Sequence, residues 1–199
     1  AILCRTNVEC REIANALRDN GLQAVVSNTG ISLTAEWRWL RACMHVLVDE
    51  TDSLSKAEII FLHQQDHNIE SLLDERLEFM QAAGDDYSKR NAWMQDYPVI
   101  VWIKENRSRL LAEPVSGMIQ LIYAGLQFHN KVIEWGNGAQ RQANLQQIVE
   151  YARQFEDHCL KLGLLPNVHG SLSWFDALAE NEQDKRGPVT NQLSVNVRT

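Results

Sequence analysis

Short apolar runs of the kind found in β-strands lie at both ends of the chain. Residues 1–4 are continuously apolar, and residues 22–26, apolar except for Gln23, form a second strand candidate behind a helical stretch that Gly21 ends. Residues 193–197 alternate between apolar and polar side chains, which is the pattern of a half-buried strand. A strand needs a neighbour for its backbone N–H and C=O groups. We therefore expect the last strand to lie in one sheet with the first, although almost the whole chain separates them.

The pattern between these two ends is helical. Apolar residues recur at spacings of three and four in stretches that begin near residues 34, 53, 69, 98, 114, 139 and 171. The fold class predicted from this order is mainly α, with a helical accessory domain inserted into a partial α/β domain that the two chain ends form. The predicted boundaries place residues 1–64 and 187–199 in the α/β domain and residues 65–186 in the insertion.

For three of these helices the pattern also predicts boundaries or the side chains that face inward. The stretch 115–131 is predicted to be one helix that Pro114 starts, and Ser171 or Ser173 is expected to begin the last helix. Within residues 69–83, the side chains expected to face inward are Leu72, Leu73, Leu77 and Met80. The acidic residues of the same helix should form a solvated face rather than a catalytic site; they are Glu70, Asp74, Glu75 and Glu78.

The tryptophans allow two interpretations, base stacking and core packing. Trp37, Trp102 and Trp174 lie on apolar helical stripes, so core packing is favoured for them. Trp39 is two positions from Trp37 and should point to another side of its helix. Trp135 precedes a Gly-Asn-Gly break and is the more exposed candidate.

Composition limits the classes of function. Hydrophobic residues make up 45% of the 199 residues, enough for a core, and the formal net charge is −7. A free-standing domain that grips nucleic-acid phosphates usually has a basic excess, so any DNA contact here should be local. The four cysteines form no CxxC pair and are interpreted as buried thiols of a reducing cytoplasm. No signal peptide and no apolar run of membrane-spanning length is present, so no membrane partner is expected.

The sequence carries none of the common catalytic signatures. It has no GxxxxGK[ST] phosphate loop, no GxGxxG after a strand, and no GxSxG, HExxH or EF-hand pattern. His63 and His67 have the spacing of metal ligands on a helix, but the residues between them favour a solvated pair, so no metal site is predicted. Arg5 directly follows the first strand, where α/β sheets bind ligands. Its guanidinium could face a phosphate, or it could be an ordinary surface arginine.

The first seven residues, Ala-Ile-Leu-Cys-Arg-Thr-Asn, resemble the fourth motif of UvrD/Rep-type DNA helicases, as does the helix behind them that ends in Asn-Gly-Leu. In that family the strand ends in Tyr-Arg-Thr-Asn, and its arginine reaches from the second RecA-like motor domain to the γ-phosphate of ATP. The resemblance makes Arg5 this catalytic, ATP-contacting arginine. Cys4 replaces the usual aromatic residue, and of the family's following turn and Glu-Arg pair only Glu36 is kept, which indicates a divergent branch.

The far end of the chain points to the branch. Segments 141–145, 152–156 and 170–175 are similar to the end of the inserted accessory domain in RecB-like subunits, the exonuclease V beta subunit and its helicase–nuclease relatives. In them Ser-Val-Asn-Val-Arg-Thr leads into the fifth motif, and the same six residues close this chain. Thr199, at the border of that motif, is therefore a candidate DNA contact. Both ends of the chain cut through strand-like runs, so we expect a piece of a longer protein.

The resemblance implies a cytoplasmic, ATP-driven 3′-to-5′ DNA helicase, or helicase–nuclease, of recombination and DNA repair. Its partners would be DNA and possibly another subunit of the same complex. ATP and Mg²⁺ would bind the full-length parent, whereas this chain lacks the phosphate loop and should bind neither, nor be an enzyme alone. The alternative from another class is a stand-alone helical protein-interaction module without a motor, which the acidic charge and the long amphipathic helices also fit.

Overall fold

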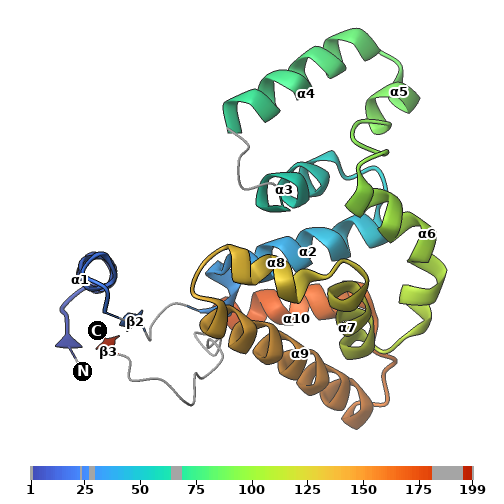
Figure 1. Ribbon diagram of the computed structural model, residues 1–199. Coiled ribbons are helices and arrows are strands. Elements are labelled where there is room, and N and C mark those ends of the chain that lie inside the picture. The colour runs from blue at the N-terminus through green and yellow to red at the C-terminus, as the bar shows by residue number, and fades with distance from the viewer. Residues whose placement is uncertain (1, 23, 27–29, 64–68, 181–194, 199) are drawn as a thin grey trace.

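The computed structural model describes residues 2–22, 24–26, 30–63, 69–180 and 195–198, and this part of the chain is mainly α, as predicted. Figure 1 shows a small α/β part, built from both chain ends, beside a larger helical body. None of the described helices combines the length and the apolar character needed to cross a membrane.

The α/β part contains β1 (Ile2–Leu3), α1 (Asn7–Asp19), β2 (Ala24–Val26) and β3 (Val195–Arg198). β3 lies between the other two strands and runs parallel to both. In the register, Ile2 is opposite Val197 and Ala24 is opposite Val195. The two chain ends therefore share one sheet, as their apolar patterns predict. Residues 193 and 194 of the predicted strand lie outside the described residues.

A small core joins α1 to the sheet. Cys10 and Ala14 of α1 are buried against Ala24 of β2, and Ile2 and Leu17 pack around them. This cluster shares no residue with the core of the helical body. The α/β part thus has its own, modest hydrophobic support for the strand ends.

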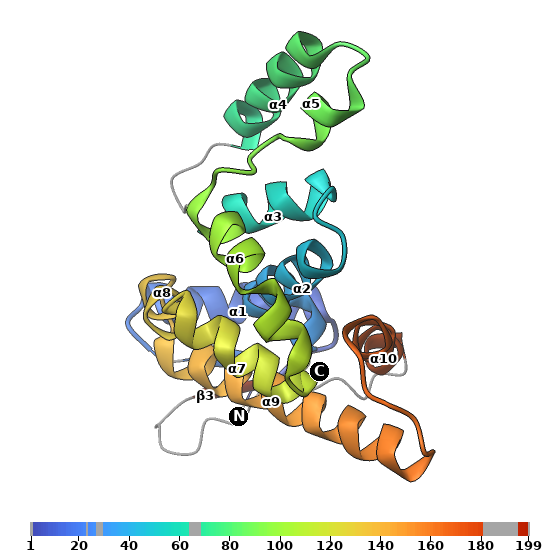
Figure 2. The same cartoon turned by 90° about the vertical axis from the view of Figure 1, so that its right-hand side faces the viewer.

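The helical body begins with a short 3₁₀ turn, η1 (Ile31–Leu33), and continues through nine α-helices in the described chain. They are α2 (Ala35–Val48), α3 (Ser53–His63), α4 (Ile69–Ala83), α5 (Tyr87–Asn91), α6 (Pro98–Ala112), α7 (Val115–Gly125), α8 (Phe128–Glu134), α9 (Gly138–Lys161) and α10 (Val168–Glu180). Figures 1 and 2 show α4 and α5 as an arm that projects from α3 and α6, away from the other helices.

α2 lies at the centre of the main core. Trp37 stacks on Phe175 of α10 with ring centroids 4.0 Å apart, and Trp39 stacks on Phe128 of α8 at 3.8 Å. Trp39 therefore points to a different side of α2 from Trp37, as predicted, and that side is core as well, because Trp39 is fully buried. Trp102, Trp135 and Trp174 are half-buried and pack against the same core, so they are less buried than Trp37 and Trp39.

The main core also joins helices from both sides of the predicted domain boundary. Leu47 of α2 and Ile59 of α3, which precede residue 65, lie in one cluster with Ile119 of α7 and Ile148 of α9. Packing alone therefore groups α2 and α3 with the later helices. The division into residues 1–64, 65–186 and 187–199 remains a prediction.

Two predicted helix boundaries are wrong. The single helix expected over residues 115–131 is two helices, because Gln127 adopts a left-handed backbone conformation with φ 50° between α7 and α8. The last helix begins at Val168, before Ser171 or Ser173. Asn167 caps it, and its side-chain oxygen accepts the N–H of Gly170 at 2.9 Å.

The inward face of α4 is narrower than the apolar pattern predicts. Leu72 is buried beside Trp93 and Ile60, whereas Leu73 and Leu77 are 55% and 57% exposed. The expectation that these two leucines face inward is wrong, because α4 belongs to the projecting arm and packs along one stripe. The four acidic residues of α4 are exposed, as predicted.

Candidate functional site

The carboxyl ends of the strands meet at one edge of the sheet, and Arg5 lies there. β1, β3 and β2 are parallel, so the residues that follow them gather at the same edge. Arg5 follows β1 in a bend before α1, and its side chain is exposed. Thr199, which follows β3, and residues 27–29, which follow β2, lie outside the described residues. In open α/β sheets this edge is where ligands bind.

A capping box fixes the backbone around Arg5. The Glu9 carboxylate Oε2 accepts the backbone N–H of Arg5 at 2.9 Å and of Thr6 at 3.1 Å. In return the Thr6 hydroxyl accepts the N–H of Glu9 at 3.2 Å. The Arg5 guanidinium itself has no ion pair or hydrogen bond in the described part of the chain. The backbone is thus held while the side chain remains available to an anion.

Among the described residues, this edge provides one cationic fork, that of Arg5, and no loop that surrounds a phosphate. Phosphoryl transfer also requires a loop that holds the phosphates, a metal ion and a positioned nucleophile. The described residues contain no group of three or more His, Cys, Asp and Glu side chains placed to hold a metal. Chemically, an exposed guanidinium at this edge can donate hydrogen bonds and positive charge to a phosphate or carboxylate.

Arg141 of α9 forms a second polar arrangement, which we call the Arg141 clamp. Its Nη1 donates to Oε1 of Glu36 in α2 at 2.9 Å, across 105 positions of sequence. Its Nε donates to the carbonyl of Gly136 at 2.8 Å and its Nη2 to that of Trp135 at 3.3 Å. The guanidinium also lies 5.4 Å from the centre of the Trp135 ring. One side chain thus ties the first turn of α2 to the α8–α9 turn.

The clamp borders a group of buried polar atoms. Glu36 is 1% exposed, and its second oxygen, Oε2, has no hydrogen-bond partner in the described part of the chain. The same holds for the Tyr123 hydroxyl and for the indole N–H of Trp39 and Trp135. Burial, with Glu36 and Cys43 adding to it, raises the pKa of Tyr123 well above its ordinary value, so the phenol stays protonated. This region can hold charge in place, and its thiol, Cys43, is buried with a pKa that burial raises well above the ordinary value.

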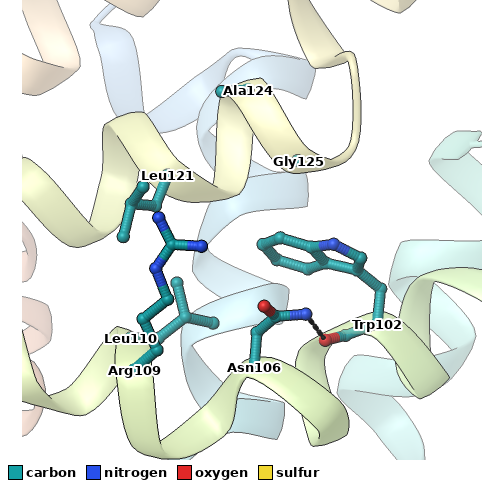
Figure 3. A pocket seen from close by; sticks show the side chains of 7 residues that line it. All are labelled: Trp102, Asn106, Arg109, Leu110, Leu121, Ala124 and Gly125. Atoms are coloured by element: carbon teal, nitrogen blue, oxygen red, sulfur yellow. Dashed lines mark hydrogen bonds between the residues drawn. The ribbon is translucent and has the colours of Figure 1, made fainter.

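A pocket of about 320 Å³ lies between α6 and α7, and we call it the α6–α7 pocket. Figure 3 shows the side chains of Trp102, Asn106 and Arg109 on α6 facing Leu121 and Gly125 on α7 across it, and Leu110 and Ala124 complete the lining. Sequence reasoning assigned Trp102 to the core and did not single out Asn106 or Arg109. The signal was present, because these three residues are spaced four and three apart, which places them on one side of a helix.

A second pocket, of about 480 Å³, lies between the arm and the start of α6. Its lining includes Phe79, Trp93 and Tyr97. Nearby, the ammonium group of Lys56 is buried and donates to the carbonyl oxygens of Asn91 at 3.1 Å and Trp93 at 3.4 Å. Burial lowers the pKa of Lys56, and Lys104 adds to this effect. Lys56 therefore anchors the arm by its C-terminal carbonyls.

The histidine pair is not assembled into a described site. His63 is half-buried, with its ring 6.4 Å from that of Trp39. Burial lowers the pKa of His63, and the charge of Lys131 lowers it further against the opposing effect of Glu134. His67 lies outside the described residues.

Comparison with known proteins assigns no relative to this chain. No model of a known protein family matches it, and no curated protein is significantly similar to it. A function must therefore be argued from the residues and their arrangement.

Proposed function

We propose that this chain belongs to the second motor domain of a RecB-like, UvrD/Rep-type DNA helicase, with the helical body as an accessory domain inserted into it. The parent would be a cytoplasmic 3′-to-5′ helicase or helicase–nuclease of recombination and DNA repair. The observation that carries the proposal is Arg5, exposed at the carboxyl edge of a parallel sheet that both chain ends build.

Two further features support the proposal. The segments that resemble helicase motifs at the two chain ends contain β1 and β3, which pair directly. Glu36 and Arg141, which also lie on segments that carry the resemblance, form an ion pair of 2.9 Å. Residues that are far apart in sequence but lie on segments that carry the resemblance are thus adjacent in the fold.

Arg5 would act on a nucleotide held mainly by the first motor domain. When bound, ATP and Mg²⁺ supply the phosphoryl group and the cation that orients it. Arg5 would present its planar fork to the γ-phosphoryl oxygens and stabilise the charge that develops there. The Thr6–Glu9 capping box and the pairing of β1 with β3 hold the backbone from which Arg5 projects. This chain alone has no phosphate loop, so we expect it to show no ATPase activity.

Steady-state ATP hydrolysis by the full-length parent, with saturating single-stranded DNA, tests this role. Arg5→Ala should lower turnover by roughly three to five orders of magnitude, the contribution of an arginine finger. Arg5→Lys should recover little, because lysine lacks the planar fork. Arg153→Ala is the control, since Arg153 is an exposed arginine of α9 and should leave turnover near that of the wild type. Near-wild-type turnover of Arg5→Ala would remove the proposed role.

A second candidate function, a helical protein-interaction module, has an observation of its own. At the turn between α9 and α10 the side chains of Leu160, Leu162, Leu164 and Leu165 are 67%, 59%, 56% and 88% exposed. Contiguous exposed apolar side chains mark interaction sites. Reading the gene on both sides of this segment separates the candidates. A phosphate-loop motif upstream and a His…Lys-Gly-Leu-Glu run downstream favour the helicase, and a stop codon directly after Thr199 favours the module.

A further inference from the structure

The α6–α7 pocket combines three kinds of chemistry in a space of about 320 Å³. This volume is at the small end of the range for ligand pockets, so it suits one ring system rather than an extended molecule. α6 provides an indole, an amide and a guanidinium, and α7 provides aliphatic side chains and a glycine (Figure 3). Each of these groups restricts what can bind.

Arg109 favours an anion. It is exposed and has no ion pair or hydrogen bond with any residue that the structure describes. Its helix carries Lys104, Arg107 and Arg109 against the single acid Glu105, and α7 has no charged residue. Arg107 is paired with Glu50 at 3.5 Å, so Arg109 is the cation of this helix that lines the pocket and remains available to a ligand. A guanidinium in such surroundings binds a phosphate or a carboxylate through two parallel hydrogen bonds.

Trp102 favours an aromatic ring. The indole packs directly against the backbone at Gly125, where a Cβ atom would clash with Cζ2 of Trp102. The benzo end of the indole points towards Arg109 and Leu121 in Figure 3. The edge of an aromatic ring is electropositive and attracts the face of another ring. A ligand ring can therefore lie against this edge and on the aliphatic side chains of Leu110 and Leu121.

Asn106 distinguishes a nucleobase from a simple aromatic acid. Its Nδ2 donates to the carbonyl of Trp102 at 2.9 Å, which fixes the amide and leaves Oδ1 as an acceptor at the pocket. An aromatic carboxylate has no N–H donor for this oxygen. A nucleobase has such a donor on its Watson–Crick edge, as well as a ring face and a linked phosphate.

We propose that the α6–α7 pocket binds one nucleotide of single-stranded nucleic acid, with the phosphate on Arg109, the base edge on Asn106 and the ring face against Trp102. This inference goes beyond the role of Arg5 and rests on different residues. Because one phosphate is engaged, binding should be weak and only mildly sensitive to salt. The affinity should fall about threefold between 50 and 200 mM salt, from a slope of about −0.7 for one phosphate on a single strand.

The test measures fluorescence anisotropy of a labelled short oligothymidylate titrated with the 199-residue chain. Arg109→Gln should weaken binding by about tenfold or more, the contribution of a charge-assisted hydrogen bond. Lys104→Gln is the matched control, because Lys104 is an exposed cation of the same helix that does not line the pocket, and it should change the affinity less than twofold. Asn106→Ala should weaken binding with unchanged salt dependence. Arg5→Ala should have no effect, which separates this site from the proposed ATP role.

Three results would overturn the proposal. Equal losses for Arg109→Gln and Lys104→Gln would show a diffuse electrostatic contact. Benzoate that displaces the oligonucleotide as well as thymidine monophosphate does would show a site for aromatic acids. The absence of saturable binding by a chain whose circular dichroism spectrum is helical would show that the pocket takes no nucleotide. Competition by thymidine monophosphate alone, lost in Arg109→Gln, is the expected outcome.

Discussion

Removal of the Arg141 guanidinium should destabilise the fold, because this side chain is the partner of a buried carboxylate and of two backbone carbonyls. Arg141→Met keeps a long apolar stem but removes the charge and the donors to Glu36, Gly136 and Trp135. Glu36 is 1% exposed, so its carboxylate would remain buried without a counter-ion. Two backbone carbonyl oxygens would also lose their donor.

Removal of one partner from a buried ion pair costs about 3–5 kcal/mol. The Arg141 side chain is 23% exposed, so water reaches part of the site, and we expect about 3 kcal/mol, at the low end. For a chain of this size that corresponds to a fall in Tm of roughly 6–12 °C. Glu36→Gln keeps the shape and an acceptor for Arg141, and should cost about 1–2 kcal/mol. Because the two side chains are in contact, the double variant should lose less than the sum of the single variants.

Urea and thermal unfolding followed by far-ultraviolet circular dichroism measures these differences. Arg153→Met is the matched control, because Arg153 pairs with Glu150 where the side chains are 55% and 50% exposed. An exposed pair contributes little, so this variant should lie within about 0.5 kcal/mol of the wild type. A free energy of unfolding for Arg141→Met that lies within about 0.5 kcal/mol of the wild type would contradict a stabilising Arg141–Glu36 pair. So would a loss that is the same in the wild-type and Glu36→Gln backgrounds.

Two further predictions concern packing and pH. Gly125→Ala should lower the free energy of unfolding in urea by about 1–3 kcal/mol, because the new methyl group meets Trp102. Gly117→Ala, where the nearest contact of the new methyl group is at 3.4 Å, should raise it by up to about 1 kcal/mol. Equal effects of the two substitutions would contradict the close approach of Trp102 to Gly125. His63 has a pKa below 6.5 in the folded chain, so the unfolded chain binds the proton more tightly and stability should fall as the pH drops from 6.5 through that lower pKa. His63→Gln should flatten this part of the pH profile of Tm, and an unchanged profile would exclude His63 as its source.

The sequence predicted the features that depend on a few neighbouring residues, namely the pairing of the terminal strands and several helix starts. The apolar ends of the chain need a sheet, and no helix can satisfy the backbone groups of a strand, so β1 and β3 pair. Thr34 and Pro98 stand at predicted helix starts, because the Thr34 side chain accepts an otherwise unpaired N–H and proline has no N–H to satisfy. These features depend on a few neighbouring residues, which the sequence displays directly.

The features that sequence reasoning missed depend on tertiary placement. Periodicity continues from α7 into α8, so the left-handed turn at Gln127 left no gap in the apolar pattern. Leu73 and Leu77 match a core stripe, but the arm carries α4 away from the helices that would cover it. The candidate site residues also differ in whether the sequence indicates them. Arg5 was singled out from its place after a strand, and its role stays a prediction. Arg109 was not singled out, because the pocket that it lines forms only where α6 packs against α7.

The order of strands in the sheet has a consequence for synthesis of the chain. β1 and β2 leave the ribosome early, but they do not pair with each other, and the strand that joins them is made last. Residues 27–194 must be translated in between, which takes roughly 8–34 s at about 5–20 residues per second. During that time two short strands have unpaired edges, which invite association with other chains. The helical body has a core of its own and can fold before β3 is made, whereas β1 and β2 stay unpaired until then. The nascent chain should therefore depend on chaperones most before residue 195 emerges.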